Sequence, residues 1–114
     1  LWWSQSSLNV LLTTSNLIKR REFAHAYQSL SNTQKYLLWL IRIETSETKH
    51  WESPTKSLEK DIDQDWYSLF QQTTTKLEPI DIKAAFKKSL ELSRELFDKL
   101  KVETKLKELL MKIE

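Results

Sequence analysis

The sequence predicts an all-α protein, a four- to five-helix antiparallel up-and-down bundle. Two long segments, 22–44 and 81–100, carry apolar side chains at intervals of about 3.6 residues, the repeat of one face of an α-helix. No segment shows the alternation of apolar and polar residues that is typical of a half-buried strand. The 114 residues suit one helical domain, 1–114, because a chain of this length can bury a hydrophobic core.

The N-terminal part of the chain predicts two long helices. The first covers residues 2–18 and ends in a run of three cations at 19–21, where positive charge favours the negative end of the helix dipole. The second runs from about Glu22 to Glu44. Its predicted inward face comprises Phe23, Tyr27, Leu30, Leu37, Ile41 and Glu44.

The middle of the chain predicts a loop and two short helices. Segment 45–52 is polar and predicts the loop. Ser53-Pro54 predicts the start of a third helix, because serine caps helices and proline is favoured at the first helical position. We expect Asp63 or Asp65 to cap a fourth segment that carries apolar residues as far as Phe70.

Two helices are expected in the remainder of the chain. Segment 73–78 breaks the pattern before Pro79, and Asp81 then predicts the cap of a long helix. Ser89 and Ser93 lie on or beside its apolar stripe, where small side chains let a neighbouring helix come close. An amphipathic helix is expected from Glu103 to the end of the chain.

Composition excludes several classes of site. The chain has no glycine, so it cannot form the loops in which glycine lets the backbone approach a phosphate. It has no cysteine, which excludes disulfides and thiolate metal sites and fits a reducing cytoplasm. The net charge of +2 and the lack of a long apolar run argue against binding to nucleic acid or to a membrane.

The two histidines suggest no metal site. The two histidines are 25 residues apart in the chain, whereas a metal site needs ligands that converge, so no metal is expected. Arg20 and His25 have the spacing of the ribonuclease motif of helical HEPN domains, in which such a pair polarises an RNA 2′-hydroxyl and phosphate. We favour the interpretation that Arg20 ends one helix and His25 lies on a solvated face of the next, because geometry and not spacing defines such a site.

Four other positions have more than one interpretation. Tyr36, Trp39 and Trp51 have basic residues nearby and could stack nucleic-acid bases. For Tyr36 and Trp39, packing against neighbouring helices is favoured because aromatic residues dominate cores. Glu44 continues an inward stripe, where a carboxylate is costly unless it is paired or faces a cleft. A helix-end glutamate turned to solvent is the alternative.

Several segments, read in order, resemble the C-terminal helical domain of aminoglycoside 6-adenylyltransferases, the streptomycin-modifying enzymes. The resemblance covers roughly residues 1–100. The segments that carry it are Leu1-Trp2-Trp3, residues 19–23 with Ala26, Leu37 to Thr45, and Lys56 to Ile62 with Trp66. An excised domain of this kind would expose its apolar start, residues 1–3, which an upstream segment would otherwise cover.

The resemblance implies a two-domain nucleotidyltransferase in which this chain is the C-terminal, substrate-binding part. An upstream domain would hold the Gly-Ser loop, the metal-binding aspartates, ATP and magnesium, so no catalytic residue is expected in this chain. The helical domain would form one wall of the cleft for a small-molecule acceptor. Carried over by position, the candidate substrate-binding residues are Trp2, Trp3, Trp39, Glu44, Thr45, Lys56 and Glu59.

One departure from the family pattern leaves the acceptor open. The family carries glycines in the loop after Ile-Glu-Thr, whereas residues 46–51 contain none. The alternative function, from a different class, is a helical interaction module or a HEPN-like module that associates with RNA.

Overall fold

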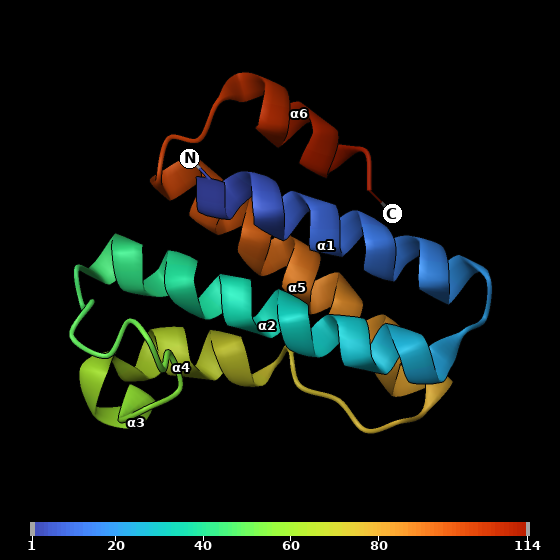
Figure 1. Ribbon diagram of the computed structural model, residues 1–114, viewed down its shortest axis with the longest axis horizontal. Coiled ribbons are helices and arrows are strands. Elements are labelled where there is room, and N and C mark those ends of the chain that lie inside the picture. Colours follow the sequence, from blue (N-terminus) through green and yellow to red (C-terminus); the bar gives the residue numbers. More distant parts are fainter. Residues whose placement is uncertain (1, 114) are drawn as a thin grey trace.

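The computed structural model describes residues 2–113, and within this range the secondary structure is six α-helices and no strand. The helices are α1 (Trp2–Lys19), α2 (Phe23–Thr45), α3 (Leu58–Asp61), α4 (Gln64–Gln71), α5 (Pro79–Lys99) and α6 (Thr104–Met111). Apart from α3, which is a single turn, successive helices run in alternating directions (Figure 1). The predicted all-α up-and-down bundle is therefore confirmed.

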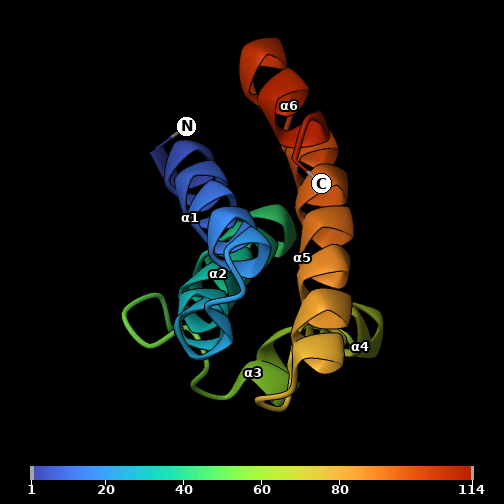
Figure 2. The same cartoon turned by 90° about the vertical axis from the view of Figure 1, so that its right-hand side faces the viewer.

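Helices α1 and α2 form a hairpin that packs on α5. Figure 2 shows the hairpin on one side and α5 on the other, with α3 and α4 at one end of α5 and α6 at the other. The helices meet over one hydrophobic core, whose fully buried members include Leu11, Leu37, Ile41, Ile82 and Phe97. None of the helices in residues 2–113 is both long and apolar enough to cross a bilayer.

Small hydroxyl side chains line the helix contacts inside this core. Ser89 and Ser93 are completely buried, and each donates a hydrogen bond to the carbonyl four residues earlier in α5. The Thr14 and Ser29 hydroxyls lie 2.6 Å apart and join α1 to α2. The expectation that small residues on α5 face a neighbouring helix is confirmed by this burial.

Three long helices end in a left-handed residue that is not glycine. Arg21, Ser46 and Lys101 have φ of 61°, 59° and 54° at the ends of α1, α2 and α5. At the end of α2, for example, the Glu47 N–H donates to the Arg42 carbonyl at 3.0 Å, which completes a Schellman motif. Glycine is the usual residue at such a position because a Cβ atom is strained there.

Glycine at these helix ends is expected to stabilise the protein. Lys101→Gly and Ser46→Gly should each raise the free energy of unfolding by about 1 kcal/mol, because they remove the strain of a left-handed residue with a Cβ. Ala24→Gly is the control: it lies exposed in α2 and should lose about 1 kcal/mol. Urea denaturation measures all three, and a loss of stability in Lys101→Gly would contradict the strain argument.

Three details of the predicted helices are wrong. Ser53 and Pro54 do not start a helix, because Arg42 binds the Pro54 carbonyl and α3 begins only at Leu58. The long C-terminal helix starts before Asp81, since Pro79 is already its first residue. This position suits the fixed φ of proline.

The third error concerns Tyr27, which is 39% exposed and not part of the core. It lies beside the irregular segment around Thr74 and Thr75, with which it lines a small cavity. The Asp63 cap is confirmed, because its carboxylate accepts the Trp66 N–H at 2.9 Å.

Candidate functional site

Five aromatic side chains gather where α1 begins and α2 approaches its end. Figure 1 shows these two helix ends at its left. We call them the aromatic cluster: Trp2, Trp3, Tyr36, Trp39 and Trp51. Trp3 is central, with ring centroids 4.4 Å from Trp2, 4.5 Å from Trp39 and 5.2 Å from Trp51. Trp2 is 62% exposed and the other four are half-buried, so the cluster presents an aromatic surface to the outside.

The cluster joins α1, α2 and the loop that follows α2. Tyr36 and Trp39 pack against Trp3 of α1, which confirms the expectation that they contact a neighbouring helix. The indole N–H of Trp39 donates to the Trp51 carbonyl at 2.9 Å, so the loop is tied to α2 at this point. Ring separations of this size are typical of favourable aromatic contacts.

Glu44 and Thr45 occupy the last turn of α2. Glu44 is half-buried, and its Oε2 atom is buried without a hydrogen-bond partner. It follows Trp39 by five residues, which turns it about 140° around the helix and moves it about 7.5 Å along the axis. Glu44 therefore points away from the cluster but lies at the same end of the molecule. Thr45 donates its hydroxyl to the Ile41 carbonyl at 2.9 Å.

Lys56 and Glu59 lie outside the cluster. Lys56 is exposed and helps to line a hollow of about 430 Å³ formed by the loop. The other lining residues are Lys49, His50, Trp51, Glu52 and Ser53. Glu59 accepts a hydrogen bond from the Tyr67 hydroxyl at 3.1 Å, and this bond raises the pKa of Tyr67. Of the seven candidate residues, the structure thus brings together only the three tryptophans.

Sequence reasoning missed Arg42, which is completely buried near the end of α2. Its guanidinium donates five hydrogen bonds: Nε and Nη2 bind the Pro54 carbonyl, Nη2 also binds Lys56, and Nη1 binds Glu47 and Asp61. The only signal in the sequence is a cation inside the apolar run Leu40 to Ile43. Its partners could not be identified from the sequence, because four of the five bonds end on backbone carbonyls.

Asp61 is the second charge of this buried network. Its Oδ2 atom lies 3.0 Å from Arg42 Nη1 and 2.6 Å from His50 Nδ1. The hydrogen bond from His50, and then that from Arg42, lowers the pKa of Asp61 below its ordinary value of 3.8. The carboxylate is therefore held in its ionised form.

The lowered pKa of Asp61 predicts a contribution to acid stability. A carboxyl whose folded pKa is depressed stabilises the protein fully above the unfolded value of 3.8, and this stabilisation is lost as the pH falls through the folded pKa below it. Asp61→Asn should therefore lower the melting temperature at pH 7. The difference in melting temperature between variant and wild type should become smaller below pH 3.8. Thermal melts from pH 7 to below pH 3.8 measure this difference. A difference that does not change with pH would contradict a lowered pKa of Asp61.

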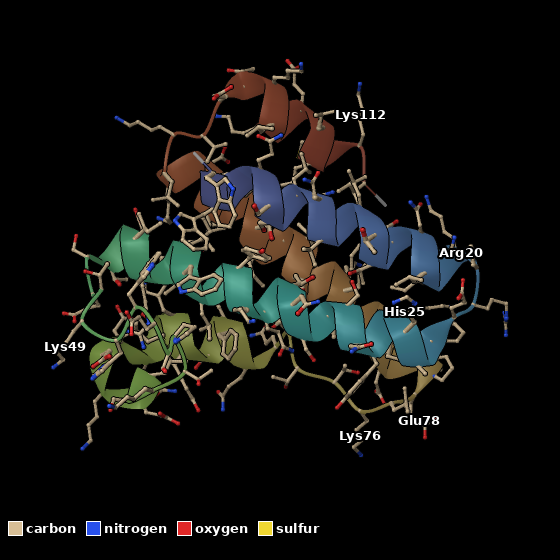
Figure 3. All side chains as sticks on the ribbon, viewed as in Figure 1. Arg20, His25, Lys49, Lys76, Glu78 and Lys112 are labelled. Carbon is tan, nitrogen blue, oxygen red and sulfur yellow. The ribbon has the colours of Figure 1, made fainter. Side chains whose placement is uncertain are left out.

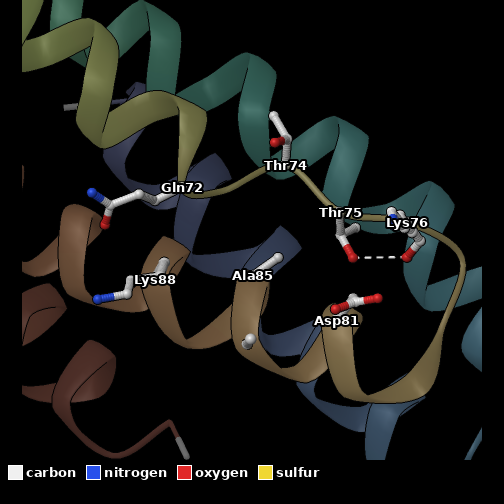
Figure 4. A pocket seen from close by; sticks show the side chains of 8 residues that line it. Gln72, Thr74, Thr75, Lys76, Asp81, Ala85 and Lys88 are labelled. Atoms are coloured by element: carbon white, nitrogen blue, oxygen red, sulfur yellow. Dashed lines mark hydrogen bonds between the residues drawn. The ribbon is translucent and has the colours of Figure 1, made fainter.

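A larger hollow lies elsewhere, between segment 72–76 and α5. It has a volume of about 800 Å³, and Figure 4 shows Lys76, Asp81 and Lys88 around a floor that contains Ala85. No candidate residue lines it, and no unpartnered buried side-chain atom of residues 2–113 belongs to it. We therefore regard this hollow as a surface depression above small side chains.

The two residues of the alternative RNA site lie on the surface of the molecule. Arg20 and His25 are exposed near the α1–α2 turn, at the far end of the molecule from Lys49 (Figure 3). Arg20 Nε pairs with the Glu22 carboxylate at 2.7 Å. Residues 2–113 also contain no group of three or more histidine, cysteine or acidic side chains that could hold a metal ion.

Comparison with known proteins identifies the family. No curated protein matches the sequence. Residues 4–113 match the family described as lincosamide nucleotidyltransferase-like, C-terminal domain, which implies an N-terminal partner domain. The resemblance to a nucleotidyltransferase C-terminal helical domain is thereby confirmed, although the family description names lincosamides and not aminoglycosides. The chain therefore belongs to the family of lincosamide nucleotidyltransferase-like C-terminal domains.

Proposed function

We propose that this domain binds the acceptor substrate of a cytoplasmic two-domain nucleotidyltransferase linked to antibiotic resistance. The N-terminal domain would bind ATP and magnesium and would transfer adenosine monophosphate from ATP to an acceptor hydroxyl, which loses its proton as pyrophosphate is released. The helical domain would supply one wall of the cleft between the domains. Its binding residues would be the aromatic cluster and Glu44, which lie on different faces of α2 at the same end of the molecule, with Lys56 at the edge.

The observation that carries this proposal is the unpartnered carboxylate oxygen of Glu44. A buried carboxylate oxygen without a donor costs free energy, so its presence is explained best by a partner that arrives from outside the domain. Glu44 lies at the end of the molecule where α1 begins at Trp2. In the proposed two-domain enzyme, an N-terminal domain that precedes α1 would lie on this side, close to Glu44.

The surroundings favour an acceptor with one amine over a polycation. The aromatic cluster suits sugar faces and apolar groups, and Glu44 suits one ammonium group. Lys49 and Lys56 are exposed on the adjoining loop and would repel further positive charge. Lincosamides carry a single basic amine, whereas aminoglycosides carry several basic groups. We therefore propose a lincosamide-like acceptor and place an aminoglycoside second.

Nucleotide transfer in the presence and absence of the N-terminal domain tests the proposal. The two-domain enzyme with ATP and magnesium should modify lincomycin faster than streptomycin, and the 114-residue chain alone should transfer nothing, because it has no phosphate-binding loop. Mass spectrometry of the antibiotic detects the transfer. Turnover by the isolated chain, or no modification of either antibiotic by the two-domain enzyme, would contradict the proposal.

RNA provides the matched test of the alternative. Incubation of the chain with RNA should give no cleavage. Cleavage that disappears in His25→Ala would establish the HEPN-like function in place of the transferase one.

A further inference from the structure

The loop between α2 and α3, residues 46–57, adopts a strained path. It begins at Ser46 and ends at Ser57, whose φ angles of 59° and 54° are both left-handed. A residue with a Cβ atom is strained in this region, and glycine would relieve the strain. The loop conformation therefore has to be held by contacts elsewhere.

Arg42 supplies contacts to both ends of the loop. One guanidinium binds the carbonyl of Glu47 near the start of the loop, and those of Pro54 and Lys56 near its end, at distances from 2.7 to 3.2 Å. The planar fork of arginine can serve several acceptors at once, which the compact ammonium of lysine cannot do with the same geometry. The loop is thus closed around a buried cation.

Asp61 and Trp39 hold the middle of the loop. Asp61 pairs with Arg42 and with His50, and the Trp39 indole binds the Trp51 carbonyl at 2.9 Å. These bonds fix the backbone on both sides of the Trp51 ring. The ring then lies 5.2 Å from Trp3 and is part of the aromatic cluster.

We propose that Arg42 and Asp61 are positioning residues for acceptor recognition, because together they hold the Trp51 ring in the wall that contacts the acceptor. This inference rests on the proposed function. Replacing a buried ion pair by apolar residues often costs no stability, so stability alone does not explain why such a pair is present. Retention of the charged network is accounted for by the fixed shape that it gives the loop.

The test combines a spectroscopic signal of Trp51 with acceptor binding. The two-domain enzyme is labelled with 5-fluorotryptophan, and Trp51→Phe assigns the Trp51 resonance in the ¹⁹F spectrum. Asp61→Asn and Arg42→Lys should shift or broaden this resonance and weaken lincomycin binding about tenfold, because small displacements of binding groups have large effects. ATP affinity should stay unchanged. Asp65→Asn, an exposed acid in the first turn of α4, is the control and should change neither signal nor affinity.

The outcomes separate this inference from the proposed function. If wild type binds lincomycin and Glu44→Gln weakens it, but Asp61→Asn moves the Trp51 resonance without loss of affinity, the network only supports the fold and the inference is wrong. If Arg42→Lys fails to fold, Asp61→Asn alone decides. If wild type binds neither lincomycin nor streptomycin while the Trp51 resonance is sharp and dispersed, the proposed function fails and the inference falls with it.

Discussion

Trp39→Ala should lower the free energy of unfolding by about 3 kcal/mol, which corresponds to a fall of roughly 10 °C in melting temperature. Trp39 packs 4.5 Å from Trp3 and 5.9 Å from Trp51, and its indole N–H ties the loop to α2. Truncation removes these contacts together and leaves a cavity between α1, α2 and the loop. Thermal melts followed by far-ultraviolet circular dichroism measure the loss.

Trp2→Ala is the matched control for this substitution. Trp2 belongs to the same cluster but is 62% exposed, so its truncation should change stability by no more than about 0.5 kcal/mol. If Trp2→Ala loses as much stability as Trp39→Ala, packing of the buried part of the cluster does not stabilise the contact between α1 and the loop. Trp39→Phe should retain most of the stability, because it keeps a ring in the cluster.

The long helices could be predicted from the sequence because each carries its own signal. The stripe of α2 and that of α5 repeat over many turns, and the prediction for α2, 22–44, differs by one residue at each end from the observed Phe23–Thr45. Local chemistry also gave Asp63 as one of two candidate caps, and the structure shows that Asp63 is the cap. Local chemistry misplaced the start of α3, because the Pro54 carbonyl is bound by a side chain distant in sequence.

The candidate site could be predicted only in part. The resemblance named Trp2, Trp3 and Trp39, which do lie together, but Tyr36 and Trp51 complete the same cluster. Trp51 lies in a polar segment without periodicity, so nothing in the sequence indicates where its ring points. Its place depends on Arg42 and Asp61, whose contacts are tertiary.

Glu44→Gln should weaken acceptor binding by about ten- to a hundredfold in the two-domain enzyme, because a buried hydrogen bond to a charged group contributes roughly 1.5–3 kcal/mol. The stability of the domain should not fall, since Glu44 Oε2 has no partner to lose and glutamine keeps the size and the helix propensity. Isothermal titration with lincomycin measures affinity, and thermal melts measure stability.

Glu47→Gln is the control for Glu44, because Glu47 is an exposed acid only three residues further along the chain. It should leave both affinity and stability unchanged, which separates a specific contact from the general loss of negative charge. Glu44→Leu is a second test, because it removes a carboxylate whose Oε2 atom has no hydrogen-bond partner. It should stabilise the domain and abolish the contact with the amine of the acceptor. A sharp loss of stability in Glu44→Gln with unchanged affinity would make Glu44 a structural partner and would place the cleft elsewhere.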